Sequence, residues 1–314
     1  MKMIEAGQVD QALTFPALID ALDHGFQQDF GMPQRQVFSL SEKPDQHDGF
    51  AVLPAWTEAV IGVKAFTYFP DNAKSGHPSL HSKILLFSRS HGLPLAMVDG
   101  TSVTYWRTAA ISALASRYLS RTNAKTLLLL GTGKLAIPLI RAHLAVRQIR
   151  RVYLWGRTLE KVFVLRQTLE TLFPDVEFFQ ALDLPDCAAQ ADIIVSATGS
   201  ATPLLSGAWI RPGCHVDLLG NHTPDRRECD SELIMKSAVF VDSRANVLKE
   251  AGELLIPIAQ GQFNAGDIRA ELAQLCRKTV PGRVDDEQIT LFKSVGTALS
   301  DVIAAHLVLL ARTD

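Results

Sequence analysis

Residues Thr126 to Arg157 read TLLLLGTGKLAIPLIRAHLAVRQIRRVYLWGR, and the rest of the chain can be placed around this stretch. It opens with a short apolar run, Thr126 to Leu130, which is typical of a strand buried on both faces of a parallel sheet. Glycines then interrupt the run, apolar residues recur at helical spacing from Lys134 to Val146, and Arg151 to Trp155 is again β-rich. The stretch therefore predicts a strand, a glycine turn, a helix and a second strand.

The glycine turn has the spacing G-x-G-x-x-A, formed by Gly131, Gly133 and Ala136. In a dinucleotide-binding turn the first glycine makes the bend, the second lets the backbone approach a pyrophosphate, and the small third residue allows close helix packing. A helix beginning near Lys134 would direct free N–H groups and the positive end of its dipole at the phosphates. The alternative is an ordinary α/β turn, since many turns hold two glycines. The residues predicted to contact the cofactor here are Gly131, Thr132, Gly133, Lys134, Leu135 and Ala136.

Length and composition limit the classes of function. A chain of 314 residues predicts two domains. A net charge of −2 without a long basic or acidic block favours a small-molecule partner over nucleic acid or a membrane surface. No apolar run reaches the roughly 18 to 20 residues that span a bilayer. The four cysteines lack metal-ligand spacing and no secretory signal is recognised, so we predict a cytoplasmic protein without a metal.

The segments before the glycine turn indicate a separate domain. Residues 1–30 are mostly helical in pattern, and residues 35–98 hold short apolar or alternating runs separated by turn residues, which predicts an antiparallel sheet. An alanine-rich helix is expected from Thr108 to Ser120. The C-terminal stretch Thr290 to Ala311 is predicted to be one long amphipathic helix that returns to this domain.

Beyond Arg157, further apolar runs alternate with helical patterns, as in a Rossmann-type doubly wound parallel sheet. We predict that residues 116–285 form this dinucleotide-binding domain. Residues 1–115 with 286–314 are expected to form an α+β domain for substrate binding and dimerisation. The strands expected after the first two are Val176 to Phe179, Ile193 to Ser196, His215 to Leu219 and Val239 to Val241.

Ligands of such sheets bind outside the carboxyl ends of the strands, which places Thr198 and Ser200 on the cofactor rim. The second strand ends in Trp155-Gly156-Arg157-Thr158, where an NAD site would carry Asp or Glu. An arginine and a hydroxyl suit a 2′-phosphate, so Arg157 and Thr158 predict NADPH, with NADH as the second choice. The alternative is that Arg157 is a solvated side chain without a ligand.

Three cationic residues have sequence neighbours that are not typical of a polar surface: Arg35, Lys64 and Arg107. A lysine in an apolar strand is costly unless it is paired or functional. The alternative for Lys64 is an edge strand that buries the stem and leaves the ammonium in water. If the three converge, two guanidinium forks and an ammonium would form a carboxylate clamp with a proton donor.

Short motifs follow one another along nearly the whole chain. They are Gly62-Val63-Lys64, Phe69-Pro70-Asp71-Asn72, Gly92-Leu93-Pro94-Leu95-Ala96, Arg107-Thr108-Ala109-Ala110, Gly131-Thr132-Gly133, Trp155-Gly156-Arg157-Thr158, Glu250-Ala251-Gly252-Glu253 and Ile289-Thr290-Leu291-Phe292-Lys293-Ser294-Val295-Gly296. In this order they resemble the ornithine cyclodeaminase and mu-crystallin family, from about Arg35 to about Ala305. The stretches Gly49 to Trp56 and His215 to Gly220 are most similar to its bacterial ketimine reductases.

The resemblance implies reduction of Δ1-pyrroline-2-carboxylate to L-proline, and of Δ1-piperideine-2-carboxylate to L-pipecolate, by a homodimer. It implies that Arg35 and Arg107 hold the carboxylate while Lys64 hydrogen-bonds near the imine nitrogen or the carboxylate. Glu250 is a candidate for a carboxylate that favours the iminium. Thr108, expected at the start of its helix, would contact the pyrophosphate beside Thr198 and Ser200.

Two rival functions remain at this point. One is a cyclodeaminase or alanine dehydrogenase-like enzyme of the same family. The cyclodeaminases carry an aspartate two residues after the glycine corresponding to Gly220, and His222 stands there instead, which argues against ornithine cyclisation. His222 also departs from the aromatic residue expected in the reductases. The other rival is a non-catalytic, mu-crystallin-like protein that binds NADPH and a small carboxylate.

Overall fold

The computed structural model describes residues 1–41 and 48–312. The chain divides into two compact units, which we describe separately. The first unit comprises Met1–Ile111 and Gly296–Asp314, and the second comprises Ser112–Val295. In the described parts of the chain, no helix combines the length and the apolar character needed to cross a membrane.

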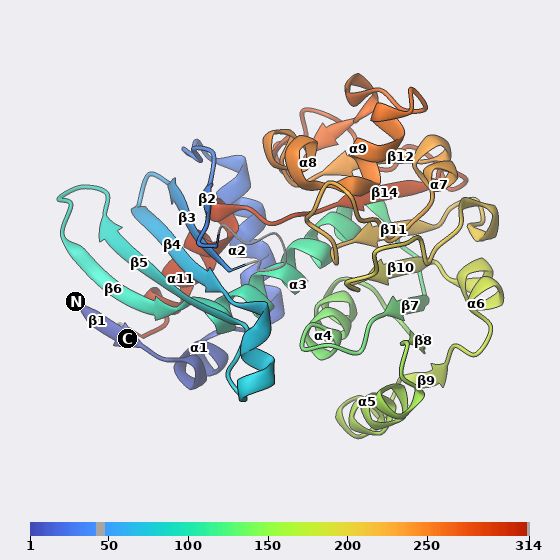
Figure 1. Cartoon of the computed structure of the whole chain (residues 1–314), viewed down its shortest axis with the longest axis horizontal. Helices are drawn as coiled ribbons and strands as arrows, with labels where there is room; N and C mark the ends of the chain where they lie inside the picture. The colour runs from blue at the N-terminus through green and yellow to red at the C-terminus, as the bar shows by residue number, and fades with distance from the viewer. Residues whose placement is uncertain (42–47, 313–314) are drawn as a thin grey trace. The chain divides into compact units, whose positions relative to one another are not determined.

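The first unit is built on a six-stranded sheet with the strand order β1-β6-β5-β4-β3-β2 (Figure 1). The neighbouring strands from β2 to β6 pair antiparallel, as the alternating runs predict, whereas the short β1 pairs parallel with β6. The strands are β1 (Lys2–Ile4), β2 (Gln36–Ser39), β3 (Gly49–Trp56), β4 (Val60–Tyr68), β5 (Leu80–Ser88) and β6 (Pro94–Asp99).

The helices of the first unit cover this sheet with apolar side chains. They are α1 (Ala6–Ala12), α2 (Phe15–Gln27), the greater part of α3 (Gly100–Leu119) and α11 (Ala298–Leu310). In α2 the buried residues recur at helical spacing, and Pro16 stands in the first turn, where its missing N–H costs no hydrogen bond. The α11 helix packs on α2 and on β3, β4 and β5, so its first three turns are almost entirely buried (Figure 1).

The second unit is an eight-stranded sheet with the order β13-β12-β14-β11-β10-β7-β8-β9, in which every pair is parallel. The order reverses between β7 and β10, which is the switch point where open α/β sheets bind ligands. The strands are β7 (Thr126–Leu130), β8 (Arg151–Trp155), β9 (Glu177–Gln180), β10 (Ile193–Ser196), β11 (His215–Leu218), β12 (Ala238–Val241), β13 (Ala270–Glu271) and β14 (Thr290–Lys293).

The helices of the second unit follow its strands in the order expected of a doubly wound sheet (Figure 1). All residues of β10, β11, β12 and β14 are buried, because both faces of the sheet are covered. The helices are α4 (Ala136–Val146), α5 (Leu159–Leu172), α6 (Leu184–Gln190), α7 (Ser231–Lys236), α8 (Arg244–Glu250), α9 (Gly252–Ala259) and α10 (Leu272–Cys276).

The long helix predicted over Thr290 to Ala311 is wrong. Its first four residues form β14, which pairs with β11 and β12 in the second unit, although the sequence analysis placed them in the other domain. The spacing of apolar residues in a short buried run does not distinguish a strand from a helix, so the sequence did not show where β14 ends and α11 begins. The chain turns at Gly296, which has φ of 87°, and Thr297 then caps α11 by accepting the Ser300 N–H.

Candidate functional site

The centre of the candidate site in the first unit is Lys64, in the middle of β4. The residue is only 3% exposed, and its Nζ donates to Oδ1 of Asp301 at 3.0 Å and to Oγ1 of Thr104 at 2.6 Å. Because β4 lies between β3 and β5, the alternative of an edge strand with a hydrated ammonium is wrong. The pKa of Lys64 is lowered to about 8, mainly by burial and also by the charges of Arg107 and Arg35, while Asp301 opposes the decrease.

Arg107 reaches the same carboxylate from α3. Its Nε donates to Oδ1 of Asp301 at 3.0 Å, and the residue is 8% exposed. Gly296 leaves room for this guanidinium, because a Cβ on Gly296 would lie 2.9 Å from Nη1 of Arg107. Arg35 lies before β2 and donates from Nη1 to the carbonyl of Gly296 at 3.4 Å. The structure therefore brings Lys64 and Arg107 together on one carboxylate and places Arg35 near enough for its charge to act on Lys64.

Asp301 is the site residue that the sequence analysis missed. It is fully buried in α11, and its Oδ2 has no hydrogen-bond partner among the described residues. An acid in the otherwise apolar first turns of a helix was the available signal, because a buried charge requires a partner. Within the first unit Asp301 provides a carboxylate to Lys64 and Arg107. Glu250 ends α8 in the second unit, and the role predicted for it stays a prediction.

Thr108 has a different position from the one expected. The helix begins at Gly100 rather than at Thr108, so Thr108 lies in the middle of α3 and not at its positive end. The prediction that Thr108 lies at the positive end of the helix is therefore wrong, and its contact with a pyrophosphate stays a prediction. At its first residue, Gly100, the helix approaches β5 closely, because a Cβ there would lie 2.7 Å from Oγ of Ser82.

The glycine turn of the second unit has the geometry of a phosphate-binding turn. Gly131 has φ of 117°, and a Cβ there would lie 2.6 Å from the carbonyl oxygen of Ala197, so only glycine fits. A Cβ on Gly133 would meet no atom within 4 Å, which leaves that backbone open to an approaching ligand. The α4 helix begins at Ala136, two residues later than predicted, and Thr132, Lys134 and Leu135 complete the turn before it. These residues fit a dinucleotide.

The end of β8 lies against this turn. A Cβ on Gly156 would lie 2.6 Å from Cγ2 of Thr132, which shows how closely the two segments approach. Arg157 and Thr158 follow, both exposed, and Thr158 is the N-cap residue of α5. A cavity of about 490 Å³ opens beside them. Its lining residues are Thr132, Gly133, Lys134, Ile137, Glu160, Lys161, Val164, Leu165 and Thr168.

Buried Glu228 holds the rim where β10 and β11 end. Its Oε1 accepts from the Thr198 N–H at 2.7 Å, the Thr198 hydroxyl at 2.8 Å and the Ser196 hydroxyl at 2.6 Å. Its Oε2 accepts from the Gly220 N–H at 2.6 Å. The predicted rim residue Thr198 is therefore fixed by a carboxylate that the sequence analysis did not identify.

A buried ion pair fixes the next part of the rim. Nζ of Lys293, at the end of β14, lies 3.0 Å from Oε2 of Glu253 and donates to the Asn221 carbonyl at 2.7 Å. The side-chain amide of Asn221 donates to the Ser200 carbonyl at 2.6 Å. His222, next in the chain, is exposed. The two rim loops are thus tied to one strand end by hydrogen bonds.

A separate buried trio lies deeper in the second unit. The hydroxyl of Ser112 donates to Oδ2 of Asp217, and it also lies 3.0 Å from Nε2 of His143. Burial raises the pKa of Asp217 to about 7 and lowers that of His143 to about 3. Asp217 therefore keeps its proton up to a pH of about 7, whereas an ordinary aspartate has lost it above about 4.

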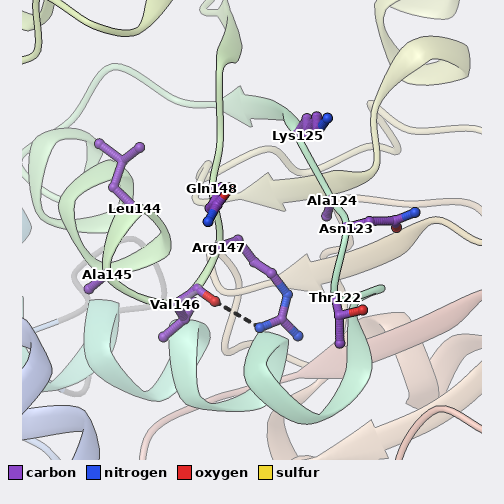
Figure 2. A pocket seen from close by; sticks show the side chains of 9 residues that line it. All are labelled: Thr122, Asn123, Ala124, Lys125, Leu144, Ala145, Val146, Arg147 and Gln148. Atoms are coloured by element: carbon purple, nitrogen blue, oxygen red, sulfur yellow. Dashed lines mark hydrogen bonds between the residues drawn. The ribbon is translucent and has the colours of Figure 1, made fainter.

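A second cavity, of about 460 Å³, lies at the amino end of β7 (Figure 2). Residues 122–125 and 144–148 line it. The Arg147 guanidinium donates to the carbonyls of Val146, Arg121, Ser116, Arg117 and Ser120, so it caps the end of α3. Because ligands of parallel sheets bind at the opposite, carboxyl end, we assign this cavity no part in the site. Among the described residues, no cluster of three or more His, Cys, Asp or Glu side chains could hold a metal ion.

Known proteins are similar to this chain over its whole length. A Δ1-pyrroline-2-carboxylate reductase of Colwellia psychrerythraea is 56% identical over 316 residues, covering 100% of both chains. A reductase of the same name from Paracoccus denitrificans is 35% identical, covering 97% of this chain and 95% of its own. The solved structure of the Thermococcus litoralis Δ1-pyrroline-2-carboxylate reductase, in complex with NADH and L-proline, is 29% identical. It superimposes with a TM-score of 0.93, covering 100% of this chain and 98% of its own. The ornithine cyclodeaminase/mu-crystallin family model matches residues 1–311, and the chain belongs to this family.

Proposed function

We propose that this chain is an oxidoreductase that uses NAD(P)H to reduce cyclic ketimine carboxylates. Δ1-Pyrroline-2-carboxylate, reduced to L-proline, is the first substrate, and Δ1-piperideine-2-carboxylate, reduced to L-pipecolate, is the second. The observation that carries the proposal is the pairing of Lys64 and Arg107 with one buried carboxylate, with Arg35 near Lys64 as a third cation. The full-length relative at 56% identity, a Δ1-pyrroline-2-carboxylate reductase, supports the same chemistry.

The surplus of cations gives the site its preference for a carboxylate. Asp301 accepts from Nε of Arg107, so we assign the Nη1 and Nη2 fork to the substrate carboxylate. A planar guanidinium matches the two carboxylate oxygens, and burial strengthens the pairing because water is excluded. Arg35 supplies the second cation of the clamp.

Lys64 holds a proton near the reacting nitrogen. Its ammonium has three protons, of which one is donated to Asp301 and one to Thr104. We assign the third to the substrate, at the imine nitrogen or the adjacent carboxylate oxygen. A pKa of about 8 keeps this proton in place at neutral pH and still makes it mobile. The chemistry that a bound reduced nicotinamide supplies is a hydride for the imine carbon.

Gly131, Gly133 and Ala136 of the second unit would hold the pyrophosphate, beside the rim residues Thr198 and Ser200. For the choice of nucleotide we propose NADPH first and NADH second. Arg157 and Thr158, just after β8, are suited to bind a 2′-phosphate. Two further cationic residues, Lys134 and Lys161, line the adjoining cavity.

We also propose a homodimer and a cytoplasmic location. The edge strand β2 of the first unit is exposed along its whole length, with Val37, Phe38 and the following Leu40 among the exposed large apolar residues. An exposed apolar edge strand needs a cover, and a second copy would supply it. Light scattering on the purified chain measures the assembly directly, and a monomeric mass would contradict the dimer.

An assay of nucleotide oxidation separates the proposed function from its rivals. With Δ1-pyrroline-2-carboxylate present, the purified chain should oxidise NADPH and form L-proline. Release of ammonia from ornithine would identify a cyclodeaminase, and faster turnover with pyruvate and ammonia an alanine dehydrogenase. Binding of NADPH without turnover of any of these substrates would identify a non-catalytic binding protein.

A further inference from the structure

The charges of the first unit raise a problem for the proposed substrate. A protonated imine accepts hydride more readily than a neutral one, but an iminium placed beside Arg35, Lys64 and Arg107 would be repelled by three cations. The substrate carboxylate offsets only part of this repulsion. A site built from these cations alone would bind the carboxylate well and disfavour the reactive iminium.

Asp301 has the position to offset that repulsion. One oxygen, Oδ1, accepts from both Nζ of Lys64 and Nε of Arg107 at 3.0 Å, so a single atom sets the relative positions of two cations. The residue is fully buried, and nearly every neighbour in its helix is apolar and buried. A carboxylate in such surroundings is costly unless its charge is compensated, and here the compensation comes from the two cations.

We propose that Asp301 is a positioning residue for the reduction: it holds Lys64 and Arg107 in fixed orientation and supplies the counter-charge that lets an iminium form among three cations. This inference rests on the proposed function. It replaces Glu250 as the carboxylate that favours the iminium.

The surroundings of Lys64 support the assignment. Among the charged groups that act most strongly on its pKa, Arg107 and Arg35 lower it, whereas Asp301 raises it by its charge and its hydrogen bond. The other elements packed on α11 present mainly apolar side chains: Leu18, Ile19 and Leu22 from α2, Leu53 from β3, and Ile84 and Leu86 from β5. Removal of the Asp301 charge should therefore lower the pKa of Lys64 below its present value of about 8.

The test compares Asp301→Asn with the wild type and with Ser300→Ala. Asparagine preserves the size and one acceptor oxygen but removes the charge. Ser300→Ala disturbs the same helix turn, where the Ser300 hydroxyl donates to the Thr297 carbonyl at 2.7 Å, without a change of charge. Each variant is assayed as the full chain with saturating NADPH, from pH 6 to pH 10.

In the wild type kcat/KM should fall above pH of about 8, as Lys64 loses its proton. In Asp301→Asn this basic limb should move down by about one pH unit or more, and kcat at pH 7 should fall at least about tenfold. KM should stay the same or decrease, because the site becomes more positive toward a carboxylate. Ser300→Ala should preserve the wild-type pH profile. An unshifted basic limb in Asp301→Asn, with kcat lowered equally at every pH, would overturn the proposal.

A second measurement does not depend on turnover. NMR of the protein labelled with ¹³C at lysine Cε follows the titration of Lys64, whose signal is assigned by its loss in Lys64→Met. The midpoint should fall by about one unit or more in Asp301→Asn, and an equal midpoint in both proteins would overturn the proposal. If the wild type reduces no imine while this midpoint falls, the proposed function fails and the electrostatic coupling stands.

If Asp301→Asn does not fold, the variant Asp301→Glu provides the test. It retains the charge but displaces the oxygen by one methylene. The basic limb should therefore stay within about half a pH unit of the wild type, while kcat falls because the two cations lose their alignment. A basic limb lowered by a full unit in this variant would contradict the proposal.

Discussion

In the first unit one buried carboxylate, Asp301, binds two cations, whereas in the second unit one buried lysine, Lys293, lies among several acids. The buried acids Asp217, Glu228 and Glu253 of the second unit each bind at least one group within the protein. Glu228, for example, accepts from two backbone N–H groups and two hydroxyls. In the first unit the cations outnumber the acid that binds them.

This difference distinguishes two uses of buried charge. The second unit uses its charges to fix backbone at the carboxyl ends of the strands, where the loops must present a rigid rim to a cofactor. The first unit keeps cationic hydrogen-bond donors in excess, which is the arrangement expected for an anionic ligand. A substitution should therefore affect mainly stability in the second unit and mainly turnover in the first.

The largest expected effect is on the stability of the second unit. Glu228→Ala leaves the partly buried N–H groups of Thr198 and Gly220 without their acceptor, so the free energy of unfolding should fall by about 3 to 5 kcal/mol. Urea denaturation followed by circular dichroism measures this. The matched control is Glu232→Ala on the exposed side of α7, which should change stability by less than about 0.5 kcal/mol. Equal stability of the two variants would contradict the stabilising role of Glu228 in the second unit.

The next effect concerns the proton on Asp217. Because its pKa is raised to about 7 in the folded chain, the unfolded chain releases this proton at lower pH than the folded chain does. Stability associated with Asp217 is therefore complete below pH of about 4 and is lost as pH rises toward 7.

Asp217→Asn, which cannot ionise, should remove this loss. Denaturation at pH 5 and pH 8 should show that the variant gains about 2 to 3 kcal/mol relative to the wild type over this interval. A difference between variant and wild type that does not change with pH would show that Asp217 is ionised throughout.

In the first unit the substitution Arg107→Ala should act on turnover. It removes the proposed clamp on the substrate carboxylate, so kcat/KM for Δ1-pyrroline-2-carboxylate should fall at least about tenfold, on the order of 1.4 kcal/mol. Arg89→Ala, which removes an exposed arginine of the same unit, should leave kcat/KM unchanged. Turnover near that of the wild type in Arg107→Ala would refute the clamp.

The smallest effect is expected at the cofactor. Arg157→Ala should weaken NADPH roughly tenfold and NADH by less than about threefold, because only NADPH carries the 2′-phosphate. Fluorescence titration of both nucleotides measures the two affinities. Arg151→Ala, at the opposite end of β8, is the control and should change neither. An equal loss for both nucleotides in Arg157→Ala would show that Arg157 does not choose between them.

Local patterns predicted the parts of the molecule that local physics determines. The run of leucines in β7, the glycine turn and the alternating strand β4 follow from burial and backbone freedom within a few residues. The three cations could be predicted because their neighbours are apolar. The β14 strand was mistaken for helix because four consecutive buried residues show no hydrophobic periodicity. The sequence around Lys293 also did not indicate its partner, Glu253.

The roles of Asp301 and Glu228 could not be predicted, because each depends on partners that only the fold brings near. Lys64 and Asp301 are 237 positions apart, and Glu228 and Ser196 are 32 apart. A buried acid in an apolar helix signals that a partner exists but does not identify it. Thr108 shows the converse: its residue type suited a helix N-terminus, but the helix starts eight residues earlier, at Gly100.

The central claim is that the excess cations of the first unit recognise a carboxylate beside the reacting imine. The most direct test compares Δ1-pyrroline-2-carboxylate with Δ1-pyrroline, which has the same ring and imine but no carboxylate. We predict that kcat/KM for the carboxylate is at least about 100-fold higher, because the neutral analogue has no carboxylate for the proposed Arg107 clamp to bind. Equal kcat/KM for the two imines would contradict the account.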